Sequence, residues 1–542
     1  MSAAIQFDTA PSRYRHLSLV ADGDIAWIHL HVAEDGGIFP GYALKLNSYD
    51  LGVDIELADV VNRLRFEHPE VGAVILTSDL PGVFCAGANI FMLSGAEHGF
   101  KVNFCKLTNE TRLAIEDATE CSGQVYVAAI NGIASGGGYE LALACSEIYL
   151  VDDRKSAVAF PEIPYLGVLP GTGGLTRLVD KRHVRRDLAD RFCTLAEGVK
   201  GRRAKEWGLV DEVVEPTRFR ELVETRARAL AAGPARANRT GVVLDPVKPR
   251  VSADGLEYEH VSLRLGPEPR TAHLVVRGPA TAAAAVTSPA ALDATWYPLR
   301  AFRELDDVLL RLRFSYPEAG LVTIETAGDL AAVLAVDDFM ARHREHWLVN
   351  EVVLLMKRVL KRLDNTARTF FALVSSGSCF AGSLLELALA ADRSYMLDDG
   401  GVAVAVSPLS FGALPMGNGL YRLAARCYPD TAPILRLRSM IAPLDAQAAA
   451  REGLVTEVLD ALDWDDELRL AAEERASLSP DALTAMESNL RFAGPETLET
   501  KIFGRLSAWQ NWIFQRPNAT GTQGALTLYG RPESATFDWR RT

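Results

Sequence analysis

The chain contains one long pattern twice, and this repeat constrains its fold more than any other feature of the sequence. Residues 56–72 (ELADVVNRLRFEHPEVG) and 304–320 (ELDDVLLRLRFSYPEAG) are identical at 11 of 17 positions. Glu140 and Glu386 are each followed by LALA at nearly the same separation. Collinear matches over this length indicate two tandem homologous domains. We predict domains at 12–255, which includes a linker, and 256–480, followed by a helical C-terminal tail at 481–542.

The first copy alternates segments typical of strands and helices. Residues 27–32, 71–78 and 125–132 are rich in β-branched and apolar residues, as buried strands are. Between the first two, residues 56–66 space their apolar side chains at helical intervals, and residues 139–148 predict a second helix after three glycines. Alternating strands and helices predict a parallel sheet with crossover helices, and therefore an α/β fold.

Composition and charge exclude several classes of protein. With 57 basic and 70 acidic residues, the formal charge is −13, which argues against a nucleic-acid binder. The seven cysteines are scattered and form no Cys-x-x-Cys pair, which fits a reducing cytoplasm and argues against a disulfide framework or a zinc site. We also expect neither a secretory signal nor a membrane span, because the N-terminus lacks a basic start and no long apolar window occurs.

Two glycine-bearing loops of the first copy are candidates for chemistry. One is FCAGANI at 84–90, after a predicted strand, and the other is NGIASGGGYE at 131–140, before a predicted helix. Glycines between a strand and a helix permit close approach of the backbone and leave free N–H groups at the helix start. Two such loops can donate to one oxygen atom, as an oxyanion hole requires, although tight packing alone also explains glycines in such turns.

Four blocks in order, at 84–90, 131–148, 160–178 and 204–214, resemble the crotonase (enoyl-CoA hydratase/isomerase) superfamily. The resemblance implies a repeated ββα fold, a CoA thioester substrate and an enolate held by two backbone N–H groups. By position, those donors are the N–H groups of Ala88 and Gly137. The loop that contains Ala86 and Gly87 is implied to lie near the adenine of CoA. Neither a metal nor a redox cofactor is implied, and CoA is part of the substrate.

Glu140 and Glu162 match the two acid–base glutamates of the hydratase branch. Two carboxyl groups at one pocket can hold a water molecule, take its proton and return it elsewhere. Burial and mutual repulsion would separate their pKa values into an acid and a base. Both lie in apolar surroundings, in YELALAC and FPEIP, where a solvated surface carboxylate is not expected.

Other positions depart from the hydratase pattern or carry weaker predictions. Asn89 stands where the family usually has Asp, so a charge is missing beside the oxyanion loop. Cys105 and Asn109 are four residues apart on one face of a predicted helix, where we expect them to contact the acyl group, although a buried packing thiol is the simpler role for Cys105. Lys45 is the candidate partner of the CoA phosphates, against the alternative of a solvated lysine.

The second copy keeps the scaffold motifs and loses the catalytic ones. The counterpart of the oxyanion loop, at 330–338, reads LAAVLAVDD without glycine. Ser383 stands opposite Gly137 and Ser407 opposite Glu162, while Glu386 survives opposite Glu140. We therefore predict a degenerate domain without a second substrate site, in which Glu386 is a satisfied helix residue.

The arrangement of an active copy, a degenerate copy and a tail rich in aromatic residues resembles a ring-opening branch of the superfamily. It implies that 2,3-epoxybenzoyl-CoA, or its dihydrodiol form, is opened with water to 3,4-didehydroadipyl-CoA semialdehyde and formate during aerobic benzoate degradation. Ordinary enoyl-CoA hydration or isomerisation is the alternative, and a CoA-binding scaffold would leave both glutamates unused. Fusion to a dehydrogenase is disfavoured, since the second copy has no dinucleotide fingerprint. We expect a homodimer with one CoA site per chain and the Trp509/Trp512 tail near an interface.

Overall fold

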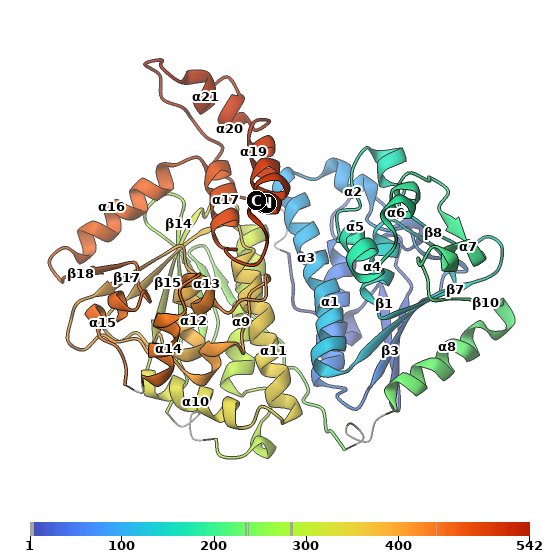
Figure 1. Ribbon diagram of the computed structural model, residues 1–542, viewed down its shortest axis with the longest axis horizontal. Coiled ribbons are helices and arrows are strands. Elements are labelled where there is room, and N and C mark those ends of the chain that lie inside the picture. Colours follow the sequence, from blue (N-terminus) through green and yellow to red (C-terminus); the bar gives the residue numbers. More distant parts are fainter. Residues whose placement is uncertain (1–4, 233–235, 237, 282–285, 441) are drawn as a thin grey trace. The chain divides into compact units, whose positions relative to one another are not determined.

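The computed structural model describes residues 5–232, 236, 238–281, 286–440 and 442–542. The chain divides into two compact units (Figure 1). The N-terminal unit is Gln6–Pro246, and the C-terminal unit is Val247–Thr542 together with Ile5. This boundary falls before the one expected from the sequence, after residue 255, because the hairpin of β11 (Arg250–Ser252) and β12 (Gly255–Glu257) joins the C-terminal sheet.

The N-terminal unit is built on a six-stranded sheet in the order β1-β2-β3-β5-β7-β10. β1 and β2 are antiparallel, and every later pair is parallel, as the alternation of strands and helices predicts. The strands are β1 Leu17–Asp22, β2 Ile25–Leu30, β3 Ala73–Ser78, β5 Val125–Ile130, β7 Glu147–Val151 and β10 Glu212–Val214.

Helices cover this sheet, and α1 to α5 carry or adjoin residues of the candidate site. Asp50 caps α1 (Leu51–Phe66) through its carboxylate, which accepts from the N–H groups of Gly52 and Val53. α8 (Pro216–Ala231) packs Phe219 and Val223 onto a face of the sheet that includes Trp27 and Ile75. The remaining helices are α2 Ile90–Gly95, α3 His98–Asp117, α4 Gly137–Ala144, α5 Gly174–Thr176, α6 Arg186–Cys193 and α7 Gly201–Glu206.

A second, four-stranded sheet positions the candidate site. It consists of β4 (Gly82–Cys85), β6 (Gly132–Ser135), β8 (Ala157–Ala159) and β9 (Val199–Lys200), in that order. β4, β6 and β8 are mutually parallel, so their carboxyl ends meet at one edge of this sheet. The chain leaves these three ends into the loop before α2, the start of α4 and the segment of Glu162.

The C-terminal unit has an eight-stranded sheet in the order β11-β12-β13-β14-β15-β16-β17-β18. Its last six strands pair as those of the N-terminal sheet do, with one antiparallel pair, β13–β14, followed by parallel pairs. The strands are β13 Val261–Leu265, β14 Thr271–Arg277, β15 Leu321–Ala327, β16 Thr369–Val374, β17 Arg393–Leu397 and β18 Glu457–Leu459.

The helices of the C-terminal unit include one that the sequence did not predict. Residues 330–338, the counterpart of the oxyanion loop in the sequence repeat, lie in α10 (Leu330–Arg342), which Asp329 caps through the N–H of Ala331. The other helices are α9 Tyr297–Ser315, α11 Trp347–Asp364, α12 Gly382–Ala390, α13 Arg422–Arg426, α14 Ala432–Ser439, α15 Ala446–Arg451, α16 Trp464–Ser477, α17 Pro480–Leu490, α18 Leu498–Lys501, α19 Ser507–Ile513, α20 Pro517–Thr520 and α21 Ala525–Leu528.

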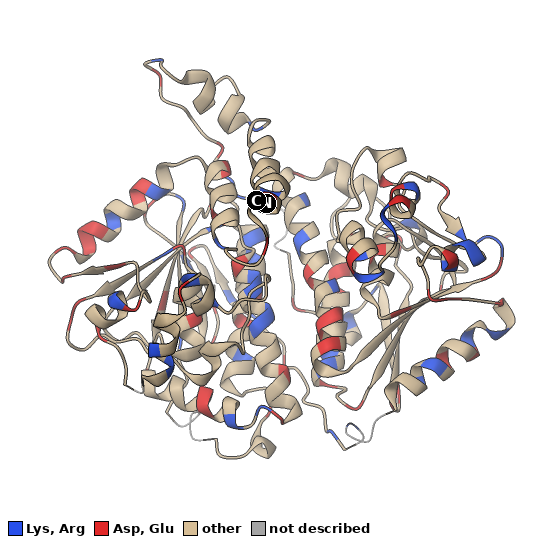
Figure 2. Cartoon of the chain, viewed as in Figure 1, with Lys and Arg blue, Asp and Glu red and all other residues tan. Residues whose placement is uncertain are grey.

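The two units contain the same buried polar contacts at repeated positions. In the N-terminal unit, the Tyr14 hydroxyl donates to Asp59, and Arg63 pairs with the same carboxylate at 2.7 Å. In the C-terminal unit, Tyr258 donates to Asp307, which pairs with Arg311 at 2.7 Å; all these residues match in the sequence repeat. Figure 2 shows that the strands of both main sheets carry few charged residues, whereas α8 and α16 carry them along their length.

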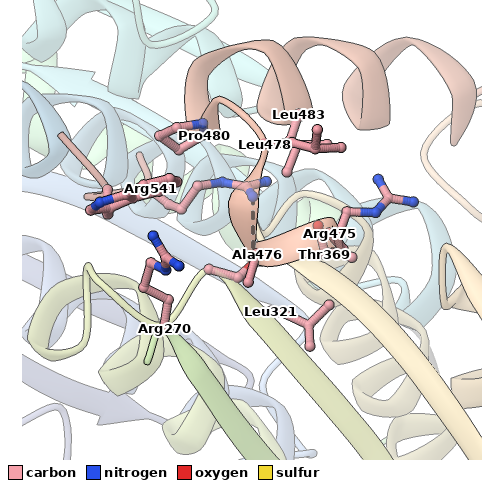
Figure 3. A pocket seen from close by; sticks show the side chains of 11 residues that line it. Arg270, Leu321, Thr369, Arg475, Ala476, Leu478, Pro480, Leu483 and Arg541 are labelled. Atoms are coloured by element: carbon pink, nitrogen blue, oxygen red, sulfur yellow. Dashed lines mark hydrogen bonds between the residues drawn. The ribbon is translucent and has the colours of Figure 1, made fainter. Parts of the chain in front are cut away.

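The end of the chain is anchored in the C-terminal unit (Figure 3). The buried Arg541 donates to Glu487 at 2.5 Å, and its own N–H donates to the carbonyl of Pro317 at 2.7 Å. The guanidinium of Arg270 lies 3.7 Å from the ring centre of Trp539. The cavity beside these residues measures about 10 Å³, room for one water molecule at most, so it is no substrate site.

Candidate active site

The start of α4 requires glycine at each of three positions. Gly136 has φ +53°, a left-handed conformation that other residues rarely adopt. A Cβ on Gly137 would collide with the hydroxyl of Tyr49, and one on Gly138 would collide with the carbonyl oxygen of Cys85. The glycine triplet therefore lets the start of this helix approach the neighbouring chain segments directly.

The loop after β4 is held by backbone hydrogen bonds to Tyr49. The N–H of Tyr49 donates to the carbonyl of Gly87 at 2.9 Å, and the N–H of Asn89 donates to the carbonyl of Tyr49 at 2.8 Å. In such a parallel bridge, the N–H of the residue between, Ala88, points away from Tyr49. A Cβ on Gly87 would lie 2.8 Å from the nitrogen of Gly137, so the two loops meet.

The structure thus brings the two predicted donors, Ala88 and Gly137, to one place. Within the part of the chain that is described, neither N–H has a hydrogen-bond acceptor. Gly137 is also the first residue of α4, where the helix dipole favours a negative charge. Two unpaired N–H groups beside each other can stabilise an anionic oxygen. Their role as an oxyanion hole remains a prediction.

Glu140 lies on α4, almost fully buried, and its carboxylate accepts three hydrogen bonds. Oε1 accepts from the N–H groups of Thr172 at 2.9 Å and Gly174 at 2.7 Å, and Oε2 accepts from the Thr172 hydroxyl. Both oxygens are therefore oriented by the segment before α5. A Cβ on Gly174 would lie 2.8 Å from Oε1, which explains the glycine there.

Glu162 has the opposite environment. Its Oε2 is buried and has no hydrogen-bond partner in the described structure, and the side chain is 9% exposed. Burial, and then the nearby charge of Glu140, raise its pKa to about 7. A carboxyl group with this pKa exchanges its proton near neutral pH. The two predicted glutamates thus differ, one fixed by donors and the other poised between its acid and base forms.

Arg112 on α3 is a buried cation that the sequence gave no reason to choose. Its guanidinium donates to the carbonyl of Gly137 and to the Tyr49 hydroxyl, each at 3.1 Å, and lies 3.6 Å from the Asp54 carboxylate. It therefore ties the start of α4 to Tyr49 and to α1. Asp54 is far away in the sequence, so no local pattern could indicate this pair.

Cys105 and Asn109 lie on α3, as predicted. Asn109 donates to the carbonyl of Gly171 at 3.2 Å, next to the residue that binds Glu140, so its amide supports that loop. Burial, and secondarily the charge of Glu140, raise the pKa of the Cys105 thiol to about 11. Cys105 is therefore protonated at neutral pH and suits contact better than nucleophilic attack.

Asn89 both accepts and donates hydrogen bonds, and an aspartate could not donate them. Its Oδ1 caps α2 by accepting from the N–H of Met92, while its Nδ2 donates to the carbonyl of Ala43 at 2.8 Å and to the Ser48 hydroxyl at 3.1 Å. A carboxylate would face the Ala43 carbonyl without a proton to donate. The departure from the family pattern thus has a structural reason.

The predicted CoA-binding residues lie together at the start of this loop. The N–H of Ala86 donates to the carbonyl of Leu46 at 3.1 Å, which places Lys45 next to the segment that pairs with the loop. Lys45 is exposed. Contact of Lys45, Ala86 or Gly87 with CoA remains a prediction.

In the C-terminal unit, Glu386 is buried on α12 and pairs with Arg422 at 3.1 Å. Arg422 also pairs with Asp364 at 2.6 Å, so this glutamate belongs to an ion-pair network. Its buried Oε1 has no hydrogen-bond partner in the described structure, so the side chain is only partly satisfied, contrary to the prediction. Within the described ranges, no group of three or more His, Cys, Asp or Glu side chains could hold a metal ion. No described helix is long and apolar enough to cross a bilayer.

The chain is similar in sequence to known proteins. Residues 44–243 match the family model "Enoyl-CoA hydratase/isomerase". The chain is 53% identical, over 99% of its length and 98% of the relative, to "Benzoyl-CoA-dihydrodiol lyase" of Aromatoleum evansii. It is 36% identical to "Fatty acid oxidation complex subunit alpha" of Idiomarina loihiensis, over 29% of this chain and 22% of that one. A solved enoyl-CoA hydratase of Bacillus anthracis is 28% identical, with a TM-score of 0.35, over 41% of this chain and 79% of that one.

Proposed function

Because the chain belongs to the benzoyl-CoA-dihydrodiol lyase family of the enoyl-CoA hydratase/isomerase superfamily, we propose that it is a carbon–carbon lyase that opens the ring of 2,3-epoxybenzoyl-CoA or its dihydrodiol form. The products are 3,4-didehydroadipyl-CoA semialdehyde and formate, and the reaction is a step of aerobic benzoate degradation in the cytoplasm. The observation that carries this function is the 53% identity over nearly the whole of both chains.

The N–H groups of Ala88 and Gly137 hold the thioester oxygen. As water attacks the ring and the carbon–carbon bond breaks, negative charge delocalises onto this oxygen. Donors that are already oriented stabilise this charge without reorganisation, and losing one typically costs a factor of about 10²–10³ in rate. Their lack of acceptors in the described structure supports this role.

Glu162 and Glu140 move the protons of the attacking water. Glu162, with its pKa of about 7, gives and takes a proton at neutral pH. Glu140, oriented by Thr172 and Gly174, positions water through its carboxylate. The epoxide with two water molecules, or the dihydrodiol form with one, contains the atoms of the semialdehyde and formic acid, so the conversion needs no redox partner. We propose that no cofactor takes part.

The C-terminal unit is a degenerate second copy of the N-terminal one, and the chain carries one CoA site. The equal strand order and the repeated Tyr–Asp–Arg contacts support common descent. Ser383 and Ser407, at the positions of Gly137 and Glu162, support the loss of chemistry. The chain forms a homodimer with the Trp509/Trp512 tail near the interface, and the exposed Phe503 and Phe514 of the same tail support this.

A product assay tests the proposed reaction. Purified protein with 2,3-epoxybenzoyl-CoA should release formate and the semialdehyde thioester, detected by mass spectrometry, and the Glu162→Gln variant should release neither at a comparable rate. Turnover of crotonyl-CoA with no ring opening would favour the alternative, an enoyl-CoA hydratase or isomerase, which the family match also allows. Calorimetric titration counts the CoA sites, and light scattering tests the dimer.

A further inference from the structure

Asp337 is a completely buried carboxylate whose partners are all neutral donors. It lies on α10 and accepts from the N–H and the hydroxyl of Ser383 and from the hydroxyl of Ser407, each at 2.7 Å. Among the described residues, no cation pairs with it. Burial raises its pKa to about 6, and the hydrogen bonds oppose this shift, so it is mostly ionised at neutral pH.

Ser383 and Ser407, the residues that donate to Asp337, correspond in the sequence repeat to residues of the candidate active site. In the N-terminal unit, Gly136 has φ +53° and donates to the carbonyl of Ala159 at 2.9 Å. In the C-terminal unit, Gly382 has φ +45° and donates to the carbonyl of Ala405 at 2.8 Å. Both members of each pair are separated by the same number of residues, so the two helix starts correspond.

The residue after each of these glycines carries the N–H group that can bind an oxyanion. Gly137 is the proposed oxyanion donor, and Ser383, its counterpart, donates its N–H to Asp337. A Cβ on Gly136 would lie 2.5 Å from the carboxyl of Glu162, whereas one on Gly382 would collide with the carboxylate of Asp337 and lie 2.7 Å from the Ser407 hydroxyl. Asp337 and Ser407 thus share the position that the acid–base carboxyl group takes in the N-terminal unit.

We infer that Asp337 is a built-in ligand of a retained oxyanion site, in which its carboxylate stands where the thioester oxygen would bind in the N-terminal unit. This inference rests on the proposed descent of the two units from one ancestor. The site takes carboxylates, and in the wild-type protein its own side chain closes it.

The two units differ in the segment that supplies the second group of the site. In the N-terminal unit, the segment after β3 forms β4 and the loop with Ala88, which provides the second donor. In the C-terminal unit, α10 follows β15 directly and brings an acceptor in place of that donor. An internal carboxylate is always present at the site, so an external acyl-CoA cannot displace it without burying unpaired charge.

Removing the side chain should reopen the site. We expect Asp337→Ala to lower the melting temperature by about 5 °C, since three buried donors lose their acceptor. Millimolar formate or acetate should restore much of this loss in a saturable way, whereas acetamide and chloride should not. NMR of ¹³C-formate should show binding to this variant beyond that of wild type, which itself carries the N-terminal site.

The matched control is Asp338→Ala, which removes an exposed carboxylate that pairs with Arg342 at 2.9 Å. It should show neither the large loss nor the rescue. Rescue by chloride as well as by carboxylates, or no extra formate binding in Asp337→Ala, would refute the inference. If that variant does not fold, Asp337→Asn decides: its side-chain oxygen can still accept from the Ser383 N–H and its NH₂ can donate to the Ser383 hydroxyl, so the side chain still fills the site, and formate binding beyond that of wild type would refute the inference. Ring-opening turnover should stay unchanged in these variants, so failure here leaves the proposed reaction untouched.

Discussion

The carboxyl group of Glu162 lies against the backbone of Gly136: a Cβ on Gly136 would be 2.5 Å from its Oε1. The residue that follows, Gly137, carries one of the two unpaired N–H groups. The candidate acid–base group and the candidate oxyanion donor therefore share the start of α4, so a thioester oxygen bound there would bring the acyl group beside Glu162.

Glu162→Gln should lower turnover at least about 10²-fold without lowering the melting temperature. The reason is that Oε2 has no partner to lose. Steady-state kinetics and calorimetry on the same preparation test both parts. Near-normal turnover would remove Glu162 from the mechanism.

Glu140→Gln should lower both turnover and melting temperature. The neutral amide loses the charge that strengthens three hydrogen bonds, because both carboxylate oxygens accept from Thr172 or Gly174. The comparison with Glu162→Gln is its control: equal melting temperatures for the two variants would contradict the assigned environments.

The activity should depend on pH through Glu162. Its folded pKa of about 7 lies above the ordinary value of 4.5, so kcat/KM should show an ionisation near pH 7 that is missing from the residual activity of Glu162→Gln. The folded state holds its proton more tightly than the unfolded chain. Its contribution to stability is therefore full below pH 4.5 and lost as the pH rises to about 7. The melting temperature of wild type relative to Glu162→Gln should fall across this window, and a constant difference would contradict it.

Asn89→Asp should lower the melting temperature and turnover together. The new carboxylate keeps the cap on α2 but cannot donate to Ala43 or Ser48, and its neighbour Ala88 carries a candidate donor. Asn238→Asp makes the same change of charge at an exposed position and should be neutral. A stable, active Asn89→Asp protein would show that the family's usual aspartate fits here.

Lys45→Ala should raise KM several-fold and leave kcat unchanged, because a phosphate contact binds the ground state and the transition state alike. Lys155→Ala, at another exposed lysine, is the control for charge. Measurement of KM with the CoA thioester substrate decides the point, and equal KM values for the two variants would exclude Lys45 from CoA binding.

The parts of the fold that depend on local pattern followed from the sequence. The strand expected at 71–78 is β3, the one expected at 125–132 is β5, and the helix expected at 56–66 lies within α1. The helix expected at 139–148 ends earlier, at Ala144, because the N–H of Ser146 pairs with the carbonyl of Tyr126 and leads the chain into β7. Strand pairing sets the C-terminal end of α4, and the helical spacing of apolar residues does not reveal it.

The candidate site was predictable where it depends on loops and not where it depends on distant partners. The glycine loops indicated Ala88 and Gly137, and the structure brings these two residues together. Arg112 and Asp337 escaped notice, since each acquires its role from residues remote in the sequence. At 330–338, the counterpart of the oxyanion loop, the sequence showed only the loss of glycine, and the structure places these residues in α10.

The glycine triplet at α4 also indicates which of the two units changed, because such a triplet is easier to lose than to regain. Three different neighbours exclude larger residues there: Glu162 at Gly136, Tyr49 at Gly137 and the Cys85 carbonyl at Gly138. Once selection for catalysis relaxes, substitutions can replace these glycines one by one. Restoring the loop requires several substitutions to glycine at once, because no single one rebuilds it. If both units descend from one ancestor, as we propose, that ancestor had the glycines and the C-terminal unit lost two of the three.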